Sequence, residues 1–183
     1  MTNKHYLILL ALTGFGNVLK AQNQSGNSVQ TTSLEMAEVV SASFFAPGSG
    51  APQSVELPMS GTNAMSEGIE SPEIEVTLQC TADFDISVAS SSEYFTYSGP
   101  STQNTDMPVE DVLKIMITEN NTGGSVGNGF SQYQPINAGL GKQVISSGQR
   151  GTRKFSFKYK AQPGFNYPAG TYTTDIVYTV SKK

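Results

Sequence analysis

The sequence predicts an all-β protein, folded as an antiparallel β-sandwich in a single domain. Short segments in which apolar and polar residues alternate recur at intervals of about 8 to 12 residues, with glycine, proline and asparagine between them. No amphipathic helix pattern follows residue 21, and we find no internal repeat. The 162 residues from 22 to 183 are enough for one domain with a buried core.

Residues 1–21 have the pattern of a cleaved signal peptide. Lys4 and His5 lie in a short polar start, residues 6–18 are mostly apolar, and the segment ends on Ala21. The apolar run is too short for a helix across a bilayer of roughly 30 Å, and we expect no transmembrane segment elsewhere. We therefore expect a secreted protein, located in the periplasm, on the cell surface or outside the cell.

The mature chain is predicted to begin with a flexible tail, residues 22–33, followed by a sandwich domain over residues 34–183. A first strand, interrupted by Glu38, is predicted from apolar residues of one parity: Leu34, Met36, Val40, Ala42 and Phe44. We expect a short strand over 54–59 and an acidic loop over 60–71.

The clearest strands are predicted at 74–80 and 84–88. Apolar residues alternate there with acidic or small polar ones, the period of two typical of a half-buried strand. Cys80 has the parity of Ile74, Val76 and Leu78, which predicts a buried, inert thiol.

The later elements follow from the same signals. An aromatic strand is predicted at 94–97, and 109–118 is assigned as a central strand, with a helical turn leading into a strand as the alternative. The loop 120–129 contains four glycines but no following lysine of a phosphate loop. We expect further strands at 143–147, 155–160 and, in strict alternation, 172–180, with a long turn at 163–170.

Histidine is absent after His5, which excludes Ser-His-Asp and Cys-His catalysis and the common histidine-containing zinc sites from the mature chain. No catalytic residue, cofactor or metal ligand is predicted, and a hydrolase using two carboxylates is the least favoured class. Hard cations bind groups of oxygen ligands, so Asp83 with Asp85, and Glu67 with Glu70, are the candidate positions for calcium. We prefer ion pairs of Asp83 and Asp85 with basic residues of a later strand, namely Lys154, Lys158 or Lys160.

Charge is distributed unevenly along the chain. Residues 22–113 contain thirteen acidic residues and no lysine or arginine, whereas residues 114–183 contain nine basic residues and two acidic ones. One interpretation is that acidic and basic strands pair side by side; the other is an acidic end and a basic end, which would favour head-to-tail contact between copies. The net negative charge argues against a nucleic-acid partner.

Four segments carry a resemblance to a known family: IEVTLQC (74–80), TADFDISVAS (81–90), VLKIMIT (112–118) and FSFKYKAQPGFNYPAGTYTTDIVYTVSKK (155–183). They resemble secreted Bacteroidota surface β-sandwiches, which are similar in turn to pilin-like subunits of the spore-coat-U and archaic chaperone-usher type. The resemblance implies an immunoglobulin-like or pilin-like fold and a fibre subunit that assembles by strand donation. Archaic pilins usually carry a disulfide, which the single Cys80 cannot form within the chain.

The leading functional hypothesis is therefore a non-enzymatic structural or adhesive surface protein, whose partners are other copies or another surface protein. Leu34, Met36, Val40, Ala42 and Phe44 are candidates either for a donated strand or for the first strand of their own sandwich. The alternative is a carbohydrate-binding module, in which a glycan would stack on an aromatic surface formed by Tyr94, Phe95, Tyr97 and Tyr133.

Overall fold

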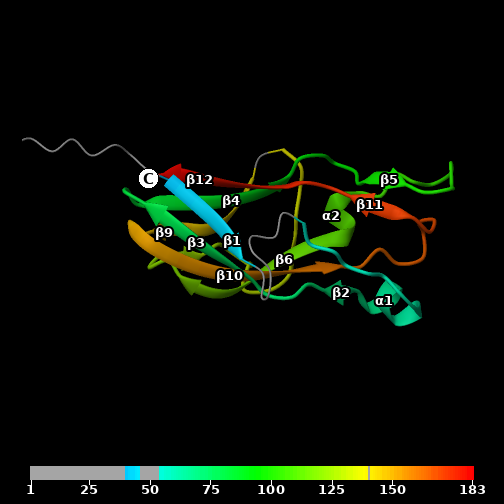
Figure 1. Ribbon diagram of the computed structural model, residues 1–183, viewed down its shortest axis with the longest axis horizontal. Coiled ribbons are helices and arrows are strands. Elements are labelled where there is room, and N and C mark those ends of the chain that lie inside the picture. The colour runs from blue at the N-terminus through cyan, green and yellow to red at the C-terminus, as the bar shows by residue number, and fades with distance from the viewer. Residues whose placement is uncertain (1–39, 46–53, 140) are drawn as a thin grey trace, which may run out of the picture. The chain divides into compact units, whose positions relative to one another are not determined.

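Two antiparallel sheets pack against each other as a β-sandwich in the computed structural model, which describes residues 40–45, 54–139 and 141–183 (Figure 1). The predicted fold class is thus confirmed. The first sheet has the strand order β1-β3-β10-β6-β8, with β2 also paired to β10. Its strands are β1 (Val40–Phe45), β3 (Ile74–Cys80), β10 (Gly151–Ala161), β6 (Leu113–Asn121), β8 (Gln134–Pro135) and β2 (Ile69–Glu70).

The second sheet has the order β12-β4-β9-β7, and a separate two-strand ribbon pairs β11 with β5. Two short helices complete the described part of the chain. These elements are β12 (Ile176–Lys182), β4 (Phe84–Ser90), β9 (Lys142–Gly148), β7 (Ser125–Val126), β11 (Thr171–Thr173), β5 (Thr96–Ser98), α1 (Thr62–Glu67) and α2 (Val109–Val112).

The core lies between the facing sides of the two sheets. Alternate residues of β3 and β4 are buried, as their sequence pattern predicts, and the largest fully buried side chains are those of Phe84, Phe155 and Phe157. The ring of Phe157 packs against Tyr159 and Tyr178 at centroid distances of 5.2 and 5.3 Å. Aromatic contacts therefore connect β10 of the first sheet with β12 of the second.

Cys80 ends β3 and is a free thiol with 5% of its surface exposed. Burial raises the pKa of this thiol, which disfavours the reactive thiolate. The prediction that Cys80 is buried is confirmed.

Several predicted elements were wrong because tertiary contacts override local alternation. No strand forms at 54–59, although Leu57 and Met59 pack against the core, and the predicted loop at 60–71 contains α1 and β2. Residues 109–112 form the helical turn α2 rather than the start of a strand, and β6 begins at Leu113. A helical turn places Val109 and Val112 on one face, and both are buried.

The predicted last strand, 172–180, is divided between two partners. Residues 171–173 form β11 and pair with β5, whereas β12 begins at Ile176 and pairs with β4. Thr174 and Asp175 lie between the two strands. Because they are two residues, the alternating apolar side chains stay at even-numbered positions on both sides of the break. The period of two therefore continues across the break and conceals it.

Among the described residues, no helix is both long and apolar enough to span a membrane.

Candidate functional site

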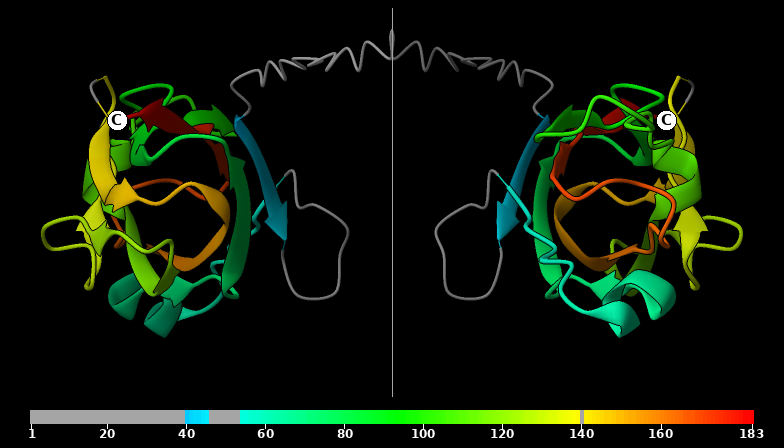
Figure 2. Two further views of the ribbon diagram at one scale, coloured as in Figure 1. Left: turned by 90° about the vertical axis from the view of Figure 1, so that its left-hand side faces the viewer. Right: turned by 90° about the vertical axis from the view of Figure 1, so that its right-hand side faces the viewer.

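Strand β1 forms the edge of the first sheet. All six of its residues pair antiparallel with β3, from Val40 opposite Cys80 to Phe45 opposite Glu75. Figure 2 shows β1 at the side of the sandwich, beyond β3. Within the described part of the chain, β1 pairs with no other strand, so its outer edge offers free backbone N–H and C=O groups.

The described side chains of β1 add nothing to the core. In antiparallel pairing, directly opposite residues point to the same side of a sheet, so Val40 and Ala42 share a side with Cys80 and Leu78. Val40 is nevertheless 54% exposed and Ala42 is also exposed, whereas Leu78 is only 1% exposed. Around residues 40–42, β1 is thus attached to the molecule through its backbone pairing with β3.

The candidate donor residues are only partly described by the structure. Leu34 and Met36 lie outside the described residues. Val40, Ala42 and Phe44 all belong to β1, and Phe44 is opposite Val76 in the register. In this structure, β1 is a strand of its own chain's first sheet, which is the second of the two roles considered for these residues.

The candidate aromatic surface is divided by burial. Tyr94 is 44% exposed, but its neighbour Phe95 is half-buried and packs against the core. Tyr97 is also half-buried, its ring lies 4.9 Å from that of Tyr172 at 49°, and its hydroxyl donates to the Ala169 carbonyl. Of these three rings, only Tyr94 is largely open to solvent, so segment 94–97 presents no flat group of rings for a sugar face.

Tyr133 lies elsewhere, immediately before β8. Its ring is half-buried beneath the Lys160 ammonium, whose Nζ is 5.8 Å from the ring centroid. The hydroxyl is buried and makes no hydrogen bond of ordinary geometry in the described structure. Burial, and secondarily the negative charge of Glu70, raise the pKa of Tyr133 to about 12. These contacts are those of a packing residue.

The sequence did not predict the exposure of Phe165, which at 67% is the most exposed large apolar side chain among the described residues. It lies in the turn between β10 and β11, where the Gly164 N–H donates to the Met65 carbonyl of α1. A long turn with no alternation has no pattern from which the exposure of Phe165 could be predicted.

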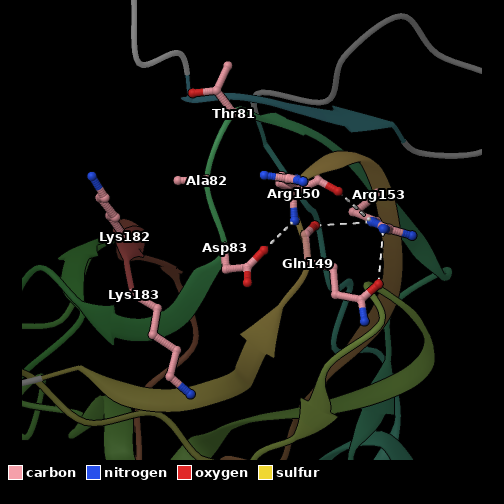
Figure 3. Close-up of a pocket in the computed structure, with 8 residues that line it drawn as sticks. All are labelled: Thr81, Ala82, Asp83, Gln149, Arg150, Arg153, Lys182 and Lys183. Atoms are coloured by element: carbon pink, nitrogen blue, oxygen red, sulfur yellow. Dashed lines mark hydrogen bonds between the residues drawn. The ribbon is translucent and has the colours of Figure 1, made fainter.

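An open depression of about 810 Å³ lies where the β3–β4 turn, the β9–β10 turn and the end of β12 meet (Figure 3). Four of its eight lining residues are basic, and one is acidic. The lining consists of Thr81, Ala82, Asp83, Gln149, Arg150, Arg153, Lys182 and Lys183.

The predicted ion pairs of Asp83 and Asp85 with Lys154, Lys158 or Lys160 do not form. Asp83 accepts a hydrogen bond from the backbone N–H of Arg150 at 3.0 Å, and Asp85 accepts one from the backbone N–H of Ser147 at 2.7 Å. Asp83 thus holds the turn between β9 and β10, and Asp85 holds the end of β9. Lys154 instead pairs with Glu75 at 2.8 Å, on the adjacent strand β3.

Within the described ranges, no group of three or more His, Cys, Asp and Glu side chains lies close enough together to hold a metal ion.

Comparison of the sequence with models of protein families found no match. Comparison with curated proteins also found none.

Proposed function

We propose that this chain is a non-enzymatic structural or adhesive protein of the bacterial cell surface, a pilus-like fibre subunit that assembles by exchanging β1 between copies. The observation that carries the proposal is the contrast between the complete pairing of β1 with β3 and the exposure of the β1 side chains at residues 40–42. The predicted signal peptide and the resemblance to surface β-sandwiches support the location.

Exchange of an edge strand such as β1 between copies should change the free energy little. A β1 strand from another copy would make the same main-chain hydrogen bonds to β3 as the chain's own strand does. Among the described residues, the buried cluster of the hydrophobic core runs from Ile74 to Ala161 and the side chains of residues 40–42 are exposed, so removing residues 40–42 from the sheet uncovers β3 without opening a cavity there. Assembly would then proceed by pairing at a sheet edge, with register set by β3.

A disulfide between neighbouring strands distinguishes exchange from pairing within one chain. Ser41 and Gln79 are directly opposite each other, and both are exposed. Directly opposite residues in antiparallel strands have Cα atoms about 4.5–5.5 Å apart, within the range that a disulfide spans. We would place Ser41→Cys and Gln79→Cys in separate, differently tagged molecules of residues 22–183, each also carrying Cys80→Ala.

Mixing these two proteins under oxidising conditions should yield a disulfide-linked pair of unlike chains if β1 is exchanged. Thr77→Cys in place of Gln79→Cys is the matched control, because Thr77 is opposite Ser43 and out of register with Ser41. Removal of residues 22–45 should abolish filaments in negative-stain images and leave a folded monomer on size exclusion. Linkage only when both cysteines are in the same molecule, with no assembly of the full-length chain, would show that β1 merely covers the edge of its own sheet.

A further inference from the structure

Basic side chains line the depression at one end of the sandwich. We define the basic end as Arg150, Arg153, Lys182 and Lys183. Arg150 and Arg153 flank the start of β10, whereas Lys182 ends β12 and Lys183 follows it, so residues far apart in sequence meet there (Figure 3).

Asp83, the acidic residue beside the basic end, forms no ion pair with Arg150 or Arg153 in the described structure. The Asp83 carboxylate is engaged by the backbone N–H of Arg150. The Arg153 guanidinium donates to neutral acceptors, the carbonyls of Gln149 and Arg150 and the side-chain oxygen of Gln149, at 3.1–3.2 Å. The ion pair between Lys154 and Glu75, at 2.8 Å, lies outside the basic end. Arg153 is thus held in place while its charge remains available.

Acidic side chains lie at the other end of the strands. We define the acidic end as Glu93, Asp106, Glu110 and Asp111, all of which are exposed. Two backbone hydrogen bonds hold these segments together as the bridge between Tyr94 and Pro108: the Val109 N–H donates to the Glu93 carbonyl and the Phe95 N–H to the Met107 carbonyl, both at 2.9 Å.

The two ends are separated by the length of the sheet. β4 runs from Phe84, beside the basic end, to Ser90, three residues before Glu93. Seven residues of strand span roughly 20 Å. Figure 1 shows the C-terminus at one end of the strands, and β5 with α2 at the other.

We infer that the basic end is a docking surface for the acidic end of a second copy of this chain. Two unlike patches at opposite ends make a heterologous contact, which continues as an open chain of subunits instead of closing as a dimer. The inference rests on the proposed self-assembly but uses a surface distinct from β1. Both interpretations of the charge asymmetry then apply. Acidic and basic strands pair within one molecule through Lys154 of β10 and Glu75 of β3, and the unlike ends pair between copies.

Such a contact orients and accelerates assembly more than it strengthens the assembled state. Exposed ion pairs contribute little each, but complementary patches steer encounters and suppress wrong orientations, and salt screens them. Strand exchange through β1, which uses main-chain hydrogen bonds, would be much less sensitive to salt. Salt dependence therefore separates the two contacts.

The test measures the osmotic second virial coefficient of residues 22–183 by static light scattering at low and high salt. The net charge of −6 over these residues predicts mutual repulsion that grows as salt is removed. Docking of unlike ends predicts the opposite, an attraction at low salt that is lost at high salt. Arg150→Glu with Arg153→Glu, and separately Glu110→Lys with Asp111→Lys, should each convert attraction to repulsion.

The variant carrying all four substitutions has the net charge of the natural chain with both ends reversed, so its attraction should return. Lys114→Glu with Lys158→Glu is the control of equal net charge for the arginine variant. Lys182→Glu with Lys183→Glu tests the basic end without disturbing the hydrogen bonds of Arg153. Circular dichroism and thermal unfolding establish that each variant is folded.

Repulsion of the natural chain at low salt, or attraction that persists in folded variants of the basic end, would overturn the inference. So would loss of retention on a heparin column without any change in self-interaction, since the basic end would then be a site for an anionic polymer. Failure of the inference would leave the Ser41–Gln79 cross-link between copies intact, whereas failure of strand exchange would abolish that cross-link and leave the salt-dependent attraction.

Discussion

The hydroxyl oxygens of Tyr159 and Tyr178 lie 2.8 Å apart and form a hydrogen bond between the two sheets. Tyr159 belongs to β10 of the first sheet and Tyr178 to β12 of the second. Their rings both pack on Phe157, so polar and aromatic contacts between the sheets meet at one place.

Loss of either hydroxyl should destabilise the sandwich. Tyr159→Phe or Tyr178→Phe leaves the other hydroxyl with its inter-sheet partner removed, which typically costs about 1–3 kcal/mol. The double variant should cost less than the sum of the two, because each single variant already removes the hydrogen bond that the two hydroxyls share. Urea unfolding of the four proteins measures this coupling, with Tyr94→Phe as an exposed control. Strictly additive changes would show that the hydroxyls do not interact.

Stability should fall at alkaline pH because of the same pair. Burial raises the pKa of Tyr159 to about 12 and raises that of Tyr178 well above its usual value, whereas an unfolded tyrosine titrates near pH 10. Below pH 10 both states are protonated and this contribution to stability is complete. Above pH 10 the unfolded state releases protons first, so the free energy of unfolding should decrease between pH 10 and 12 and beyond. Unfolding followed across this range, compared with the double phenylalanine variant, should show a flatter dependence in the variant.

Gly127→Ala should disrupt the pairing of β7 with β9. An added Cβ would lie 1.9 Å from the Gln143 carbonyl oxygen, a backbone atom that cannot rotate away, and the Gly127 N–H donates to Val144 at 2.8 Å. We expect a loss of about 1–3 kcal/mol in the free energy of unfolding. Gly139→Ala is the comparison, since its φ of 88° is unfavourable for alanine but no atom lies within 4 Å. Equal effects in the two variants would contradict the clash.

The Lys154–Glu75 ion pair should contribute little to stability despite its 2.8 Å distance. Both side chains are about half exposed, at 51% and 43%, and solvent screens such pairs. A double-mutant cycle with Glu75→Gln and Lys154→Met should give a coupling below about 1 kcal/mol that declines in high salt. A larger coupling that is insensitive to salt would indicate that the pair is shielded from water.

Amide hydrogens of β1 should exchange before those of β3 and β10. A strand attached by one row of backbone hydrogen bonds opens locally at lower free energy than strands paired on both sides. Hydrogen exchange followed by mass spectrometry should show early labelling of residues 40–45 and late labelling of β10. Equal protection would mean that β1 opens only with the whole domain, which would weigh against exchange of the strand.

The sequence predicted best those strands that are buried on one side. Ile74, Val76 and Leu78 are all buried as their alternation requires, and β4 follows the same rule. The prediction of a strand at 109–112 was wrong because this apolar run is short. Over so few residues, the period of two of a strand cannot be distinguished from a helical turn. The predicted partners of Asp83 and Asp85 were wrong for a different reason: the true donors are the backbone N–H groups of Arg150 and Ser147, and a backbone group has no signal in the sequence.

The sequence by itself determined the all-β class, the burial of Cys80 and the unequal charge of the two halves, because periodicity and composition act locally along the chain. The tertiary structure alone decided that β1 pairs at the edge of the first sheet and that Arg150, Arg153, Lys182 and Lys183 meet at one end. Strand pairing and the meeting of turns bring together residues separated by tens of positions, and a single sequence contains no local pattern that specifies such distant contacts.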